Sequence, residues 1–297
     1  MTNEQKTESG ITRVAVCGAG AMGLQIAMTV AQAGKTATLF DVNREQLVRA
    51  QATMEQLLEK YTARGRLNAG EDESIRKNLE FFDELPPAVK DVDLVIEAIV
   101  EDLQAKVDLF QKLEKLTEKN TILATNSSSI VSSKLIETLE NPERVCNLHF
   151  FNPAMVMPLV EVVKGLHTED GIVDQVFSFA GEVGKKPIRI EKEVFGFVTN
   201  RLLSVLLDEA IWLLENGVAS IEDIDTAAKA GLNHPMGPFE LLDFTGIDIN
   251  YGIKMQQAAE SGDESQGPSE TLKTLMSEGK LGKKSGQGFY SYPREKK

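Results

Sequence analysis

His149 and Glu161 are the residues whose types and surroundings best suit proton transfer. His149 closes the apolar run Val145–Leu148 and precedes the turn Phe150–Pro153. An imidazole titrates near neutral pH, so a histidine at a strand end is suited to general acid–base chemistry. Glu161 lies in the mostly apolar run Pro158–Val163, where an unpaired carboxylate would be costly and a histidine partner would remove that cost. The alternative is that Glu161 alternates out to solvent on an edge strand.

A glycine-rich run follows the first β-branched segment of the chain. The segment Val14–Gly23 contains G-x-G-x-x-G between a predicted strand and a predicted helix. Gly18 would make the tight turn, Gly20 would let a pyrophosphate approach the backbone, and Gly23 would let the helix pack against the sheet. The free amides and the positive dipole end of that helix also favour phosphates. The pattern predicts a dinucleotide site.

Asp41 indicates which dinucleotide would bind. It follows the second predicted strand, Thr36–Phe40, 23 residues after Gly18. Its carboxylate can accept hydrogen bonds from both ribose hydroxyls of NAD and would repel the additional phosphate of NADP, so NAD is the predicted cofactor. Arg44 could favour NADP, but a solvated arginine at a helix start is the preferred interpretation.

Polar residues follow two further predicted strands. Ala98 ends the predicted strand Leu94–Ala98 and Glu101 follows it, which places both at the carboxyl edge of the sheet where cofactors lie. Lys106 follows Glu101 by about one helical turn, a spacing that usually yields an exposed ion pair, and a role near the nicotinamide is the alternative. Asn126 begins the run Asn126–Ser129, whose amide and hydroxyls could hold the nicotinamide carboxamide or a substrate oxygen. A helix cap is the competing interpretation of the serines.

These residues need an α/β framework to bring them together. Short apolar runs alternate with helical stretches as far as Ile190, which predicts a Rossmann-type, doubly wound, mostly parallel sheet in a domain covering residues 1–192. Asn43–Ala63 is a polar helix capped by Asn43, and residues 64–78 would complete a helical insertion. The predicted strands are Val14–Cys17, Thr36–Phe40, Leu94–Ala98, Thr121–Ala124, Val145–His149, Leu159–Val163 and Ile188–Ile190.

Residues 193–297 are predicted to form an all-α domain. Val194–Glu215 is expected to be one long helix that ends near Gly217, and Ser220 is expected to begin the next. Apolar residues recur along the long helix at helical spacing, which predicts a homodimer through this domain; burial within one subunit is the alternative. These residues are Phe197, Leu202, Leu203, Leu206, Leu207, Ile211 and Leu214.

Composition excludes several other classes of protein. The formal net charge of -13 would repel a phosphate backbone, so a nucleic acid partner is not expected. No apolar run is long enough for a membrane span, and the first ten residues resemble neither a secretory signal nor a transit peptide. Cys17 and Cys146 lie in apolar runs without metal-ligand spacing, so we expect reduced core thiols, a cytoplasmic protein and no metal site. His167 and His234 suit surface or structural roles.

Taken together, these motifs resemble the 3-hydroxyacyl-coenzyme A dehydrogenase family over nearly the whole chain. So many matches in one order are more specific than any single motif. The matching runs are Gly18–Gly23, Glu97–Glu101, Thr125–Ser129, Asn147–Pro153, Pro158–Val163, Gly196–Arg201, His234–Asp243 and Gly288–Tyr290.

The resemblance implies a role for each matching residue. His149 would be the catalytic base and Glu161 its partner, while Ser128 and Asn200 would contact the hydroxyl or thioester carbonyl of the substrate. Basic residues of the insertion are candidates for binding coenzyme A: Lys60, Arg64 and Arg66. The expected cofactor-binding residues are Gly18, Gly20, Met22, Gly23, Asp41, Ala98, Glu101, Lys106 and Asn126.

The family also implies an activity and an assembly. The reaction would be the reversible, NAD-dependent oxidation of an (S)-3-hydroxyacyl-CoA, held between two domains, to a 3-oxoacyl-CoA, with short chains such as 3-hydroxybutyryl-CoA favoured and a homodimer built by the helical domain. Two alternatives stay open. One is an NAD-dependent dehydrogenase of a free hydroxy acid, and the other is a homologue that binds NAD without turnover.

Overall fold

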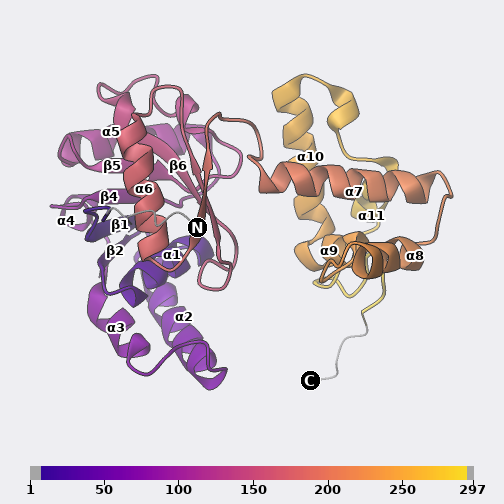
Figure 1. Cartoon of the computed structure of the whole chain (residues 1–297), viewed down its shortest axis with the longest axis horizontal. Coiled ribbons are helices and arrows are strands. Elements are labelled where there is room, and N and C mark those ends of the chain that lie inside the picture. Colours follow the sequence, from indigo (N-terminus) through magenta and orange to yellow (C-terminus); the bar gives the residue numbers. More distant parts are fainter. Residues whose placement is uncertain (1–7, 293–297) are drawn as a thin grey trace, which may run out of the picture. The chain divides into compact units, whose positions relative to one another are not determined.

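The computed structural model describes residues 8–292, and the chain divides into two compact units, Met1–Phe197 and Val198–Lys297. The first unit contains a sheet with helices on both faces, and the second contains helices (Figure 1). Within residues 8–292, no helix is long and apolar enough to span a bilayer.

An eight-stranded sheet organises the first unit, in the order β3-β2-β1-β4-β5-β6-β7-β8. Every neighbouring pair is parallel except β6 and β7, which are antiparallel. The predicted Rossmann-type, mostly parallel sheet is therefore confirmed. The strands are β1 Arg13–Cys17, β2 Thr36–Phe40, β3 Leu79–Phe82, β4 Leu94–Glu97, β5 Ile122–Thr125, β6 Val145–Phe150, β7 Leu159–Val163 and β8 Lys186–Ile190.

Two apolar cores cover the two faces of this sheet because successive side chains of a strand point to opposite sides. Val14 and Val16 of β1 pack in one core with α1 and α6, whereas Ala15 and Cys17 pack in the other with α5. Cys146 is also fully buried, which confirms both thiols as core residues. The helices of this unit are α1 Ala21–Gln32, α2 Arg44–Ala63, α3 Glu71–Asn78, α4 Leu85–Ala88, α5 Leu103–Leu116 and α6 Asp170–Glu182, with short 3-10 turns at Ser132–Lys134 and Pro142–Arg144.

The predicted helical insertion is present as α2 and α3. The Asn43 side chain caps α2 by accepting hydrogen bonds from the amides of Glu45 and Gln46. Strand β3 was not predicted, because it follows α3 directly and its sequence, Leu-Glu-Phe-Phe, lacks the β-branched residues present in each predicted strand. Its pairing with β2 extends the sheet beyond the strand that carries Asp41 at its end.

The second unit corrects one predicted helix. Helix α7 begins at Thr199, not at Val194, since Gly196 and Phe197 both have positive φ (75° and 49°), which a right-handed helix cannot accommodate. The predicted boundaries at Gly217 and at Ser220, which accepts a hydrogen bond from the amide of Asp223, are confirmed. The helices are α7 Thr199–Glu215, α8 Ile221–Thr226, α9 Pro238–Thr245, α10 Ile247–Ser261 and α11 Glu270–Ser277, with a π-helical turn at Ala227–Gly231 and a 3-10 turn at Glu264–Gln266.

The apolar residues predicted along this helix do not all lie in the core of the second unit. Leu207 and Ile211 are buried in the core of the second unit, and Leu203 and Leu214 pack against it. Leu202 is 70% exposed, whereas Phe197 belongs to a small apolar cluster of the first unit. Only some of these residues therefore serve the fold of the second unit.

Candidate active site

His149 and Glu161 form a buried pair across the antiparallel strands β6 and β7. The two residues are directly opposite in the register, and Nδ1 of His149 lies 2.8 Å from Oε2 of Glu161. Glu161 is 0% exposed, and β7 lies between β6 and β8, so the alternative of a solvated edge-strand carboxylate is wrong. In the neutral imidazole the carboxylate favours the proton on Nδ1, which leaves Nε2 as the basic nitrogen.

Two aromatic rings flank this imidazole. The ring centroid of Phe151 lies 4.5 Å from that of His149, and the centroid of Phe197 lies 5.7 Å from it. Phe197 is buried and holds the left-handed backbone conformation described above. Sequence reasoning missed its contact with His149, because it assigned Phe197 to a helix.

The three glycines of G-x-G-x-x-G meet different constraints. A Cβ at Gly18 would lie 2.5 Å from the carbonyl oxygen of Ala98, and a Cβ at Gly23 would lie 1.8 Å from that of Gly18. A Cβ at Gly20 would meet no protein atom within 4 Å. The first and third glycines therefore serve close packing, while the second faces open space of the kind that a pyrophosphate requires.

Asp41 lies in a pocket of about 930 Å³ that also includes Gly18, Gly20 and Ala98. Its carboxylate accepts hydrogen bonds from the amides of Ala19 and Asn43, each at 2.9 Å, which hold it at the end of β2. The open face of Gly20, the oriented carboxylate and the size of the pocket fit a dinucleotide with a free ribose diol. Arg44 pairs with Asp83 and its side chain is 84% exposed, as expected for a solvated arginine at a helix start.

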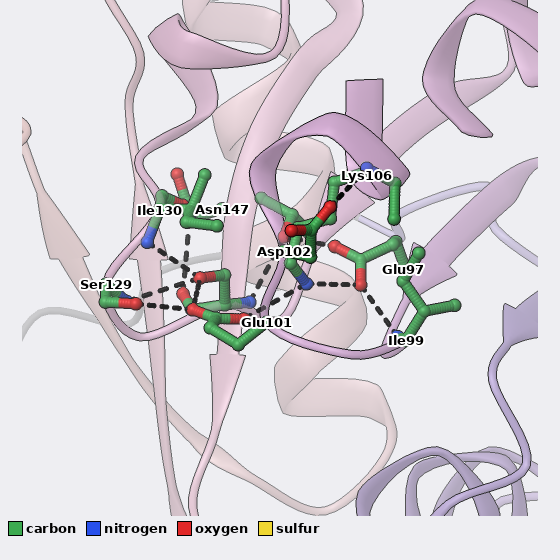
Figure 2. A network of polar contacts seen from close by, with 11 residues as sticks. Glu97, Ile99, Glu101, Asp102, Lys106, Ser129, Ile130 and Asn147 are labelled. Atoms are coloured by element: carbon green, nitrogen blue, oxygen red, sulfur yellow. Dashed lines mark hydrogen bonds and ion pairs between the residues drawn. The ribbon is translucent and has the colours of Figure 1, made fainter. Parts of the chain in front are cut away.

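Lys106 lies in a buried network at the ends of β4 and β5, so the interpretation of an exposed ion pair is wrong. The residue is 1% exposed, and its Nζ lies 2.5 Å from Glu97 and 3.1 Å from Glu101 (Figure 2). Glu101 also accepts hydrogen bonds from the hydroxyls of Ser127 and Ser129. Burial opposes the ionisation of Glu101, but Lys106 and the two hydroxyls outweigh it, so the pKa of this carboxyl is lowered.

The serine run forms a turn next to the His149 strand. The Ser127 hydroxyl oxygen accepts hydrogen bonds from the amides of Ser129 and Ile130, as a capping serine does, but no helix begins at this turn. The next helical turn begins at Ser132 and has Val131 at its N-cap, so the serines cap no helix. Asn126 accepts a hydrogen bond at 2.8 Å from the amide of Phe150, the residue after His149. Ser128 is half-buried on the same turn. The structure therefore brings Asn126 and the serine turn to the end of β6.

Other predicted residues lie apart from this arrangement. Lys60, Arg64 and Arg66 are exposed at the end of α2 and after it, and none of these three described residues lines the pocket at Asp41. Asn200 lies in the first turn of α7, in the second unit, and is half-buried. Nothing in its local sequence other than the family resemblance pointed to it. Met22 is half-buried in the first turn of α1, next to Gly23.

Family profiles cover both units. Residues 13–194 match the NAD binding domain of 3-hydroxyacyl-CoA dehydrogenase, and residues 196–292 match its C-terminal domain. The prediction of NAD as the cofactor is thereby confirmed.

Individual proteins give the same result. The mitochondrial hydroxyacyl-coenzyme A dehydrogenase of Homo sapiens is 39% identical over 289 residues, which are 95% of this chain and 91% of the human protein. A probable 3-hydroxybutyryl-CoA dehydrogenase of Bacillus subtilis is 37% identical over 282 residues, 95% of this chain and 98% of that protein. The crystal structure of (S)-3-hydroxybutyryl-CoA dehydrogenase from Ralstonia eutropha superposes with a TM-score of 0.89 at 32% identity, over 96% of this chain and 100% of the other. The chain belongs to the 3-hydroxyacyl-CoA dehydrogenase family.

Proposed function

We propose that the protein catalyses the reversible, NAD-dependent oxidation of (S)-3-hydroxyacyl-CoA to 3-oxoacyl-CoA, with short chains such as 3-hydroxybutyryl-CoA as substrates. The observation that carries the proposal is the buried His149–Glu161 pair, 2.8 Å apart, in the same unit as a dinucleotide pocket. Family membership and the names of the relatives support a coenzyme A thioester as the substrate.

His149 is the proposed base of the reaction. In the oxidative direction its Nε2 takes the proton of the 3-hydroxyl, and the Glu161 carboxylate stabilises the imidazolium that results. The pocket at Asp41 would hold NAD, which would supply the acceptor for the hydride of C3. In the reductive direction Nε2 of His149 returns the proton to the oxygen at C3.

The remaining site residues would bind and orient the reactants. Ser128 and Asn200 are proposed to hold the substrate hydroxyl or thioester carbonyl, with Asn126 and Glu101 on the nicotinamide side and Lys106 behind Glu101. The motif glycines, Met22, Asp41 and Ala98 would hold the rest of NAD. Coenzyme A carries phosphates, so the exposed cations Lys60, Arg64 and Arg66 are proposed to contact it.

Oxidation of NADH by acetoacetyl-CoA tests this function directly. The purified protein should turn over rapidly with NADH and the thioester, and far more slowly when NADPH replaces NADH or free acetoacetate replaces the thioester. Equal rates with free acetoacetate would instead identify a hydroxy-acid dehydrogenase. Tight binding of NADH without turnover of short or long 3-oxoacyl thioesters would identify a non-catalytic homologue.

Asp41 should set the preference between the two nicotinamide cofactors. An Asp41→Ser variant is expected to raise KM for NADH about tenfold and to gain turnover with NADPH, because it lacks the carboxylate that would accept hydrogen bonds from the ribose hydroxyls and repel a phosphate. Steady-state kinetics with both cofactors measures the change. Asp174→Ser, at an exposed aspartate of α6, is the control. An unchanged NADH to NADPH ratio in Asp41→Ser would contradict this role.

The protein is proposed to be a homodimer through its second unit. Large apolar side chains remain exposed on α7, α9 and α10 of that unit, including Trp212 at 54% and Phe244 at 61%. Such surfaces are typical of association sites. Light scattering after size-exclusion chromatography should give twice the 32.6 kDa mass of one chain, and Leu202→Glu should reduce it. Val48→Glu, on α2 of the first unit, should leave the mass in solution unchanged. If the parent protein has the mass of a single chain, the dimer is refuted.

We also propose that the enzyme works in the reducing cytoplasm. Cys17 and Cys146 are both free and fully buried. Burial raises the pKa of both thiols, that of Cys146 to about 12, so neither is present as a reactive thiolate at neutral pH. Unpaired, unreactive thiols are typical of proteins in that compartment.

A further inference from the structure

Glu97 is a buried carboxylate to which the proposed mechanism gives no role. It is the last residue of β4, it is 0% exposed, and it lies opposite Thr125 of β5 in the register of the sheet. Oε1 accepts hydrogen bonds from Nζ of Lys106 at 2.5 Å and from the amide of Ile99 at 2.7 Å, and Oε2 accepts one from the Thr125 hydroxyl at 2.6 Å. A charge with this many partners inside the sheet holds a defined position.

Stability alone does not account for this arrangement. Removing an ammonium and a carboxylate from water costs about as much as their attraction returns, so an apolar pair of similar volume would serve the core as well or better. The Glu97–Lys106 pair also lies at the carboxyl edge of the sheet. There β4 continues into the loop that leads to Glu101, and β5 continues into the serine turn. Its position points to a role in shaping these loops.

The loop after β4 and the serine turn after β5 both donate hydrogen bonds to the Glu97 carboxylate. The hydrogen bond from the Ile99 amide fixes the start of the loop that leads to Glu101, and the hydrogen bond from Thr125 fixes the start of the serine turn. The loops meet again where Glu101 accepts hydrogen bonds from Ser127 and Ser129. Figure 2 shows this series of contacts running from Ile99 and Glu97 to Glu101 and Ser129.

Lys106 is shared between the two carboxylates. Its Nζ is closer to Glu97, at 2.5 Å, than to Glu101, at 3.1 Å. Without the negative charge of Glu97, the ammonium would be attracted to Glu101 alone. Glu101 would then move toward Lys106 and away from the serine hydroxyls that now orient it.

We propose that Glu97 is a positioning residue for the dehydrogenase reaction. Through Lys106 it sets the place of the Glu101 carboxylate, and through Thr125 it sets the place of the turn that carries Ser128. The inference rests on the proposed function, because it assumes that NADH binds beside Glu101. It assigns Glu97 no contact with the reacting atoms.

A Glu97→Gln variant tests the proposal, since glutamine keeps the size of the side chain and removes its charge. The dissociation constant of NADH, measured from its fluorescence, and KM for NADH should both rise on the order of tenfold, the scale at which supporting residues usually act. KM for acetoacetyl-CoA should also rise, because the position of the turn that carries Ser128 depends on Glu97 through Thr125. The kcat value should change much less, because His149 and Glu161 lie on other strands. A role in folding alone would lower thermal stability and leave KM for NADH unchanged.

Lys106→Met and the double variant show whether Glu97 acts through Lys106. If it does, the double variant should bind NADH about as tightly as Lys106→Met alone, so that the two losses are not additive. Glu114→Gln is the matched control, because this carboxylate also accepts hydrogen bonds from loop amides of the same unit, those of Glu140 and Asn141. NADH affinity of folded Glu97→Gln within twofold of the parent, or additive losses in the double variant, would overturn the proposal.

The binding measurement keeps this proposal separate from the proposed function. NADH fluorescence needs no acyl thioester, so failure of the acetoacetyl-CoA assay in the parent protein would leave the Glu97 measurement intact. Normal turnover by the parent together with unchanged NADH affinity in Glu97→Gln would refute the positioning role alone.

Discussion

A His149→Ala variant is expected to retain its fold and its affinity for NADH and to lose about 10²–10⁴-fold in kcat, the usual contribution of a general base. The expectation follows from the pair on β6 and β7, in which Glu161 favours the Nδ1 proton and leaves Nε2 to accept the proton of the substrate. Pre-steady-state mixing with acetoacetyl-CoA and NADH measures the loss at the chemical step.

His167→Ala provides the matched control for this variant. His167 is exposed in the segment between β7 and α6, so its removal should leave kcat unchanged. Full turnover by His149→Ala would remove the assignment of the base. Circular dichroism and NADH fluorescence show whether the variant protein is folded and binds its cofactor.

Glu161→Gln should lower kcat on the order of 10²-fold, a large part of what the base contributes. The amide can still accept a hydrogen bond from Nδ1 of His149, but it no longer stabilises the imidazolium that forms when the proton is taken. KM for NADH should change little, because the dinucleotide pocket lies at other strands. Steady-state kinetics in both directions measures the effect.

Glu80→Gln is the comparison for Glu161→Gln. Glu80 lies on β3 of the same sheet but is exposed, so neutralising it should not alter kcat. Equal activities of Glu161→Gln and the parent would show that the carboxylate serves folding, not proton transfer. Lost activity together with an unfolded circular dichroism spectrum would require the more conservative Glu161→Asp variant, which should restore part of kcat if the charge matters.

Local patterns predicted the nucleotide-binding half of the fold well. The glycines, the strand that ends at Asp41 and the cap at Asn43 each depend on neighbours within a few residues, so their spacing carries the information. Strand β3 and the start of α7 were not predicted correctly. The pairing of β3 with β2 and the positive φ of Phe197 both depend on contacts with distant parts of the fold. The periodicity of the apolar residues alone predicted a helix over residues 194–198, which lie before α7.

Site residues could be predicted where the neighbouring residues of the same strand define their surroundings. An apolar run around Glu161 signalled a buried partner, and the register of β6 and β7 provides it. The burial of Lys106 was not predictable, since it requires Glu97 and Glu101 to converge on one ammonium across a loop. For Asn200, no charge, strand end or spacing distinguishes it from other polar residues at helix starts.

The antiparallel pairing of β6 and β7 makes the His–Glu unit a product of one contiguous stretch of chain, residues 145–163. Residues added to the connection between the two strands would lengthen a turn and leave the pair opposed. A single residue inserted within either strand would reverse which side chains face the imidazole and would place valine where the carboxylate now lies. Length variation among homologues of this protein should therefore be tolerated in the exposed part of the connection, residues 156–158, and eliminated by selection within either strand.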